Sequence, residues 1–258
     1  MHAAWRLQPV FPPAVEFRAE KMFEITVNRT TPPTPYALFF LASLLLGFLF
    51  IAVRLWKKGL PKNIIGYSVM LNLVAMLYGA KMLSVITSGG KQNLLTAGFS
   101  SLGGVFGICV GIAVFQKIYG KHRGDFWEVY SMALPLMYSV SKLGCFFAGC
   151  CFGIPYEGIG RVSYTNLNEI PGTVFPVQLV ESITFLLLLL VLCVLTGKLK
   201  QQTLISLTVV LCIILKFGLD FLRDSHRTQA VSVNQWLCVG MLLVFILVKI
   251  KRKKMQPD

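Results

Sequence analysis

Charged residues are scarce in this chain. Asp, Glu, Lys and Arg make up only 14% of its 258 residues, whereas a soluble domain carries about 25%. Hydrophobic residues reach 55%, and the mean hydropathy is +0.67. This balance excludes an ordinary soluble domain and predicts an all-α integral membrane protein.

Acidic residues are the scarcer charged class, with 11 against 25 Lys and Arg, and the net charge is +14. In a soluble protein such an excess would suggest nucleic-acid binding. Here the basic residues fall between apolar runs, and no basic stripe interleaved with aromatics is evident outside them. We therefore expect no nucleic-acid partner and attribute the basic residues to membrane topology.

Residues 1–35 lack an apolar core of signal-peptide length. Their prolines favour an irregular extracytoplasmic arm, and Met22 is an alternative start of the chain. Residues 36–250 form the predicted membrane domain. It has seven apolar segments, each close to the length of about 20 residues that spans a bilayer: Tyr36–Trp56, Ile64–Ile86, Ala97–Ile118, Phe126–Ala148, Pro176–Thr196, Leu204–Leu222 and Gln235–Ile250.

The distribution of basic residues predicts the orientation. Fourteen of them lie on the side that holds the first, third and fifth loops and the tail at 251–258, and eight lie on the other side. Cytoplasmic loops collect Lys and Arg, so we expect the N-terminus outside and a basic cytoplasmic tail. The longest outer loop, 151–175, would form a small extracytoplasmic head between spans four and five. Alternation in "GRVSYTNL" predicts a short hairpin there.

An ionisable residue within a span costs several kcal/mol unless it faces a protein interior or a polar cavity. Five such residues are candidates for a polar site: Lys81, Lys142, Glu181, Lys216 and Asp220. Lys216 and Asp220 are four residues apart, so they share a helix face. Arg223 follows three residues later. The alternatives are internal ion pairs or lysines that snorkel to the interface. Because cations outnumber acids, the set predicts a polar cavity for an anionic phospholipid headgroup.

Three of the seven cysteines cluster, at Cys145, Cys150 and Cys151. Four interpretations stay open. A metal site lacks CxxC spacing and a second Cys/His pair. A disulfide from Cys145 requires that the helix end at Gly149. A reactive thiol is favoured by Lys142, one turn before Cys145. Tight packing of small residues against neighbouring helices is the simplest interpretation, and no metal is predicted.

Several segments resemble the prolipoprotein diacylglyceryl transferase family. "YGAKML" resembles its Gly-Ala-Arg segment, and "SSLGGVFG" resembles its His-Gly-Gly segment, with Leu102 at the histidine position. "SKLGCFFAGCCFG" resembles the family signature, with Lys142 at its arginine, Cys145 at an asparagine and Cys150 at the glutamate. Four more stretches follow in the family's order: "PTPYALFF", "FPVQLVES", "LKFGLDFLRD" and "VNQW".

The resemblance implies a seven-span enzyme of the bacterial inner membrane. It would transfer a diacylglyceryl group from phosphatidylglycerol to the lipobox cysteine in a prolipoprotein signal peptide, without a cofactor. The catalytic positions would be Lys142, Lys216, Asp220 and Arg223, with the two lysines holding the lipid phosphate. Substrate-binding positions would be Tyr36, Lys81, Gly103, Gly104, Cys145, Cys150, Gly153 and Glu181, the two adjacent glycines allowing close approach of the lipid.

Two other classes of function remain open from the sequence. One is a non-catalytic protein that binds or transports phospholipid on the same scaffold. The other is a membrane thiol–disulfide protein that uses Cys145, Cys150 and Cys151. For the transferase, no neutral base replaces the histidine missing at Leu102. His226, near the outer end of span six, is a candidate for that role.

Overall fold

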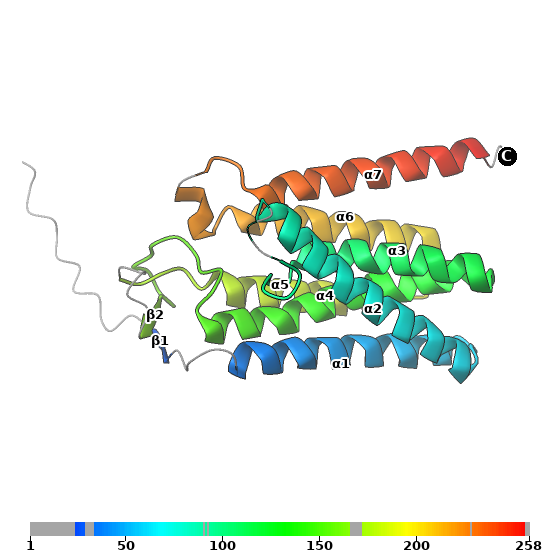
Figure 1. The fold of residues 1–258 in the computed structure, drawn as a ribbon, viewed down its shortest axis with the longest axis horizontal. Helices are drawn as coiled ribbons and strands as arrows, with labels where there is room; N and C mark the ends of the chain where they lie inside the picture. The colour runs from blue at the N-terminus through cyan, green and yellow to red at the C-terminus, as the bar shows by residue number, and fades with distance from the viewer. Residues whose placement is uncertain are drawn as a thin grey trace, which may run out of the picture.

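The computed structural model describes residues 24–28, 34–89, 91, 93–165, 172–227 and 229–255. In this part of the chain seven long helices lie alongside one another, and two short strands sit at one end of them (Figure 1). Each helix coincides with one predicted span, so the all-α membrane fold is confirmed. The helices are α1 Thr34–Lys57, α2 Lys62–Thr87, α3 Ser101–Tyr119, α4 Arg123–Ala148, α5 Val177–Leu195, α6 Gln201–Asp220 and α7 Val233–Met255.

Six of these helices are long and apolar enough to cross a membrane, and α4 is the exception. Length is not the reason, because α4 has 26 residues, or about 39 Å at 1.5 Å per residue. Its lower hydropathy is the reason, because the charged Asp125, Glu128 and Lys142 lie along it together with several serines and tyrosines. The helix packs against α1, α5 and α6, so these charges meet protein groups rather than lipid.

Close approach of α2 and α3 depends on glycine. A Cβ atom on Gly107 would lie 2.9 Å from the Cα of Met76 and would collide with the Ala75 carbonyl. Gly79 and Gly103 oppose each other in the same seam, each against the other's carbonyl oxygen. Within a bilayer, the hydrophobic effect does not drive helices together, because lipid tails are as apolar as the helix side chains. Helices therefore associate through close packing, which small residues such as glycine allow.

The two strands form a parallel pair. β1 (Ile25–Asn28) lies beside β2 (Val162–Thr165), with Ile25 opposite Val162. Two predictions are corrected here. The arm is not irregular at Ile25–Asn28, and the ladder of β2 runs to β1 rather than to a hairpin partner. Val162 and Val174 form only a single antiparallel bridge.

Alternation explains the strand pairing. Val162 and Tyr164 on β2 are buried and pack with Val27 from β1, Val174 and Phe146 from α4. The intervening Ser163 is half-buried, on the other face of the strand. This small apolar cluster ties the strands to the end of the bundle where α4 ends and α5 begins (Figure 1).

A second set of polar side chains lies near the opposite ends of the helices. We call it the distal polar cluster: Arg54, Lys58, Asp125, Glu128 and Gln201. The Lys58 ammonium lies 2.9 Å from a carboxylate oxygen of both Asp125 and Glu128. Gln201 donates to the same two carboxylates at 2.9 Å. The cluster therefore joins α1, α4 and α6 through the charges of α4.

Candidate functional site

Five ionisable side chains from three parts of the chain meet near the strand end of the bundle. We call them the central charge cluster: Lys142, Glu181, Lys216, Asp220 and Arg223. Lys142 comes from α4, Glu181 from α5, and Lys216 and Asp220 from α6. Arg223 follows α6 directly. All five are buried, and both acids have no exposed surface.

Glu181 is the centre of this cluster. One carboxylate oxygen lies 2.8 Å from the Lys142 ammonium, and the other lies 3.3 Å from that of Lys216. Arg223 donates from one guanidinium nitrogen to both oxygens, at 2.7 and 3.0 Å. The Tyr138 hydroxyl donates at 2.8 Å. One carboxylate therefore holds three cations that would otherwise repel one another.

Asp220 forms the second acidic position. Its carboxylate lies 3.4 Å from the Lys216 ammonium, which is the predicted i,i+4 pair, and 3.4 Å from the Arg223 guanidinium. Ser232 donates its hydroxyl to Asp220, and the Asn234 side chain donates at 3.4 Å. Asp220 thus links α6 to the segment that begins α7.

The sum of charges in the central charge cluster is positive. Lys142, Lys216 and Arg223 contribute three positive charges, and the two carboxylates contribute two negative charges. The net value is one positive charge in an environment of low dielectric constant, where an anion is attracted far more strongly than in water. Both ammonium groups also lie over the Tyr138 ring, 5.0 and 5.5 Å from its centroid. The arrangement suits the binding of one anionic group.

Gly153 explains how Arg223 reaches the cluster. The two residues form an antiparallel bridge. A Cβ atom on Gly153 would lie 2.5 Å from the Phe175 carbonyl oxygen and 3.0 Å from that of Leu222. Ile154 donates its backbone N–H to Leu222 at 3.1 Å. Gly153 therefore lets the segment after α4 pack against the end of α6, beside the guanidinium.

Three thiols lie next to this segment, and we call them the thiol cluster: Cys145, Cys150 and Cys151. Their sulfur atoms all lie within 4.8 Å of one another. As predicted, α4 ends before Gly149, which caps it in the left-handed conformation at a φ of 64°. Cys151 is also left-handed, with a φ of 57°. The left-handed conformations of Gly149 and Cys151 thus bring together three cysteines that a continuous helix would separate.

None of the three cysteines is in a disulfide, and Cys151 is exposed. Hydrogen bonds from the Cys145 and Cys150 thiols hold the pKa of the Cys151 thiol well below its usual range, and the charges of Lys142 and Arg223 act in the same direction. The thiol cluster therefore lies within electrostatic reach of the central charge cluster.

Tyr36 and Lys81, two further predicted substrate-binding residues, are not members of the central charge cluster. Tyr36, in the first turn of α1, stacks on Phe40 at 6.2 Å between ring centroids. Its backbone faces Gly144 of α4. Lys81 on α2 donates to the Ala97 carbonyl at 2.6 Å and lies 4.7 Å from the Phe99 ring centroid. Lys81 therefore holds the segment before α3 against α2.

The role predicted for the paired glycines needs correction. Both are buried against α2, where Gly103 faces the Gly79 carbonyl and Gly104 faces Met76. The space beside them is filled by helix backbone and side chain, so they serve helix packing rather than approach of lipid. Leu102, where the resemblance places a histidine, packs in an apolar cluster with Ile213 and Cys238.

Several partners of the central charge cluster were not predicted from the sequence. Tyr138 lies one turn before Lys142 on α4, and that i,i+4 spacing was the available signal. Ser232 and Asn234 become partners through the turn that brings α7 back to α6, which no local pattern shows. The side chain of His226 and the alternative start at Met22 lie outside the described residues.

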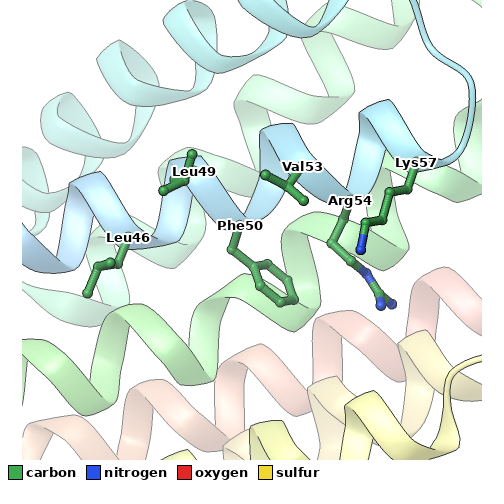
Figure 2. A pocket seen from close by; sticks show the side chains of 6 residues that line it. All are labelled: Leu46, Leu49, Phe50, Val53, Arg54 and Lys57. Atoms are coloured by element: carbon green, nitrogen blue, oxygen red, sulfur yellow. The ribbon is translucent and has the colours of Figure 1, made fainter.

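A groove of about 370 Å³ runs along α1 (Figure 2). It is lined by Leu46, Leu49, Phe50, Val53, Arg54 and Lys57. Phe50 and Arg54 project from the same side of the helix (Figure 2). The groove contains none of the predicted site residues. Its apolar lining, with two cations at one end of it, is typical of a surface that faces lipid.

The fold and the site together define a multi-pass membrane protein with a cationic centre buried among its helices. Residues 26–251 match the family model described as prolipoprotein diacylglyceryl transferase. The chain belongs to this family, which is a family of transferases, and the predicted membership is confirmed.

The matched relatives have low sequence identity to this chain, but the matches cover most of its length. A protein of Clostridium tetani named phosphatidylglycerol--prolipoprotein diacylglyceryl transferase is 25% identical over 74% of this chain and 82% of its own length. A similarly named protein of Clostridium perfringens is 23% identical over 77% of this chain and 84% of its own length. A protein of the same name from Dehalococcoides mccartyi is 26% identical over 69% of this chain and 74% of its own length.

Proposed function

We propose that this protein transfers a diacylglyceryl group from phosphatidylglycerol to the thiol of a lipobox cysteine in a prolipoprotein. Membership of the family supports the reaction class. The observation that carries the proposal is the central charge cluster, in which Lys142, Lys216 and Arg223 surround Glu181 with one positive charge in excess. A cationic centre of this kind suits the phosphate of an anionic lipid.

In this proposal the two lysines bind the lipid phosphate. Each ammonium has three donors, so a lysine that contacts Glu181 retains donors for a phosphate oxygen. Lysine binds phosphate as a point charge rather than through a planar fork. As the bond between the glyceryl carbon and the phosphate oxygen breaks, negative charge develops on the leaving glycerol phosphate. Cations already held in place stabilise that charge without rearranging.

In this proposal the two carboxylates, Glu181 and Asp220, hold the cationic side chains in position. Glu181 has no exposed surface and pairs with all three cationic groups, so its role is to keep them together before the lipid arrives. Asp220 orients Lys216 and links it to Ser232. Both are positioning residues, and the pre-organised cations are the groups that touch the lipid.

We propose the bacterial inner membrane as the location, with the N-terminus and the two strands outside. The excess of basic residues in the opposite loops supports this orientation. The central charge cluster would then lie in the outer half of the bilayer. That depth is close to the phospholipid headgroups of the outer leaflet.

The test is a transfer assay with purified protein, phosphatidylglycerol and a lipobox peptide, with the product measured by mass spectrometry. We expect a thioether-linked diacylglyceryl peptide. Lys142→Ala and Lys216→Ala should each reduce the rate by about 10²-fold or more, the effect of removing one transition-state donor. Lys198→Ala, an exposed residue beyond α5, serves as the matched control and should keep the wild-type rate.

Two outcomes would count against the proposal. A fully active Lys142→Ala/Lys216→Ala double variant would show that the phosphate binds elsewhere. If the folded wild-type protein bound phosphatidylglycerol but made no product, the scaffold would be a lipid-binding protein without transferase activity.

A further inference from the structure

The thiol cluster has a geometry that its sequence spacing conceals. The CFFAGCC segment has no CxxC pair, yet the sulfur atoms of Cys145, Cys150 and Cys151 lie within 4.8 Å of one another. The end of α4 at Gly149 and the left-handed Cys151 produce this convergence. A disulfide would use two of the three sulfurs, whereas a metal ion would use all of them.

The separation suits a soft metal ion. A zinc ion binds thiolate sulfur at about 2.3 Å, which places three sulfurs around it about 3.8–4.0 Å apart. Small side-chain rotations bring sulfurs within 4.8 Å to that separation. Soft thiolate ligands select Zn²⁺ or Cu⁺ over hard cations such as Mg²⁺.

We propose that Cys145, Cys150 and Cys151 form a three-thiolate site for a soft metal ion of the zinc type, with a fourth coordination position left open for an exogenous thiol. Three thiolates and a divalent ion carry one net negative charge. Lys142 precedes Cys145 by three residues on α4, so a cation lies beside this negatively charged site.

A buried amide next to the thiol cluster also points to a ligand. The Gln178 side chain has no exposed surface, and its nitrogen donates to the Cys150 carbonyl at 2.9 Å. Its oxygen has no hydrogen-bond partner among the described residues. An acceptor left unpaired in a buried position costs about 1–3 kcal/mol. A donor on an incoming ligand would satisfy it.

The open position gives this site a use, and this step rests on the proposed function. Leu102 removes the family's histidine, so the acceptor thiol needs another means of activation. A thiol that coordinates zinc loses its proton, here to water at the outer face. The resulting thiolate sulfur forms a bond to the glyceryl carbon. The bond from that carbon to the phosphate oxygen breaks, and its electron pair leaves with glycerol phosphate.

The first experiment measures metal directly, without any turnover. Tag-free wild-type protein in detergent is equilibrated with Zn²⁺ or with Co²⁺, separated from free metal and analysed by elemental mass spectrometry. We expect about one ion per chain, and in the cobalt form a thiolate-to-metal charge-transfer band and the intense visible bands of tetrahedral cobalt. Cys150→Ser should lower metal retention at least 10-fold. Cys109→Ser, a half-buried cysteine on α3, is the matched control and should retain the ion.

The second experiment adds a lipobox peptide to the cobalt form. A cysteine peptide should shift the visible bands as a fourth sulfur binds, and the same peptide with serine in place of cysteine should not. Absence of the shift would overturn the open-position role while leaving the metal site intact.

Other outcomes separate the two proposals. Three free thiols without bound metal, or a disulfide found by differential alkylation, would overturn the metal site. If that protein still transferred diacylglyceryl groups, the proposed function would stand alone. A metal-loaded protein that shows the thiol shift but makes no thioether product would instead contradict the proposed function.

Discussion

Glu181 lies at the centre of the central charge cluster. Its carboxylate forms ion pairs with three cations, accepts a hydrogen bond from one tyrosine hydroxyl and has no exposed surface. A single substitution at this position therefore alters the charge balance of the whole site. This makes Glu181 the best residue for separating the structural from the chemical role of the cluster.

We expect Glu181→Gln to destabilise the protein, because three buried cations would then face only one carboxylate. Removal of one partner from a buried ion pair costs about 3–5 kcal/mol. The measurement is thermal unfolding in detergent, followed by tryptophan fluorescence, together with the transfer assay. Glu157→Gln is the control, since Glu157 is exposed in the outer loop and should change neither quantity.

A compensating variant sharpens this prediction. Glu181→Gln combined with Lys142→Met restores a net charge of one positive unit. We expect the double variant to recover much of the lost stability but no activity, because Lys142 is needed for the phosphate. A double variant as unstable as Glu181→Gln would show that shape or hydrogen bonding, rather than charge, dominates at this position.

At the scale of helices, the structure depends on which faces contain glycine. The α2–α3 seam is closed by backbone contact at Gly79, Gly103 and Gly107. The resemblance assigned Gly103 and Gly104 to lipid approach. Only the packed structure shows that α2 occupies that space.

Gly107→Ala should destabilise the bundle by about 1–3 kcal/mol, the cost of overpacking a close contact. The added methyl group would collide with the Ala75 carbonyl, and backbone cannot move aside as a flexible side chain can. Gly66→Ala on α2 is the control, because no heavy atom lies within 4 Å of its Cβ position. In thermal unfolding, the control should raise stability by about 0.5–1 kcal/mol through helix propensity. Equal effects from both variants would contradict the seam.

At the scale of the whole molecule, two polar clusters lie near opposite ends of a mostly apolar bundle. Both use charges of α4, the long helix of the described chain that is not apolar enough to be a candidate membrane span. The strands lie at one end, and the C-terminal end of α7 lies at the other (Figure 1). The molecule therefore has two distinct ends, as an asymmetric membrane requires.

The orientation is testable with reporter fusions. Green fluorescent protein attached after residue 255 should fluoresce, because it folds in the cytoplasm. Alkaline phosphatase fused after Gly160, in the outer loop, should be active only if that loop is exported. Replacing Lys57, Lys58 and Lys62 with glutamine should weaken the orientation, since positive charge near the first spans directs insertion. The reverse reporter pattern would invert the proposed topology.

Local patterns in the sequence determined where the helices lie and which ionisable residues are buried within them. Apolar runs predicted seven helices within a few residues, because span length follows directly from bilayer thickness. Lys142, Glu181, Lys216 and Asp220 were recognisable as a site because ionisable residues are costly within a span. The strand pairing was not predictable, since β1 and β2 are separated by four helices and no local rule selects a partner across that distance.

Tertiary packing decided which polar residues share a site. Lys81, like Lys142, is a lysine within a predicted span, yet its ammonium group donates to the Ala97 carbonyl and not to a carboxylate of the central charge cluster. The spacing of Cys145, Cys150 and Cys151 argued against a metal, but the left-handed turns after α4 bring their sulfurs together. The cost of burying a charge can be read from the sequence, whereas its partner depends on how the helices pack.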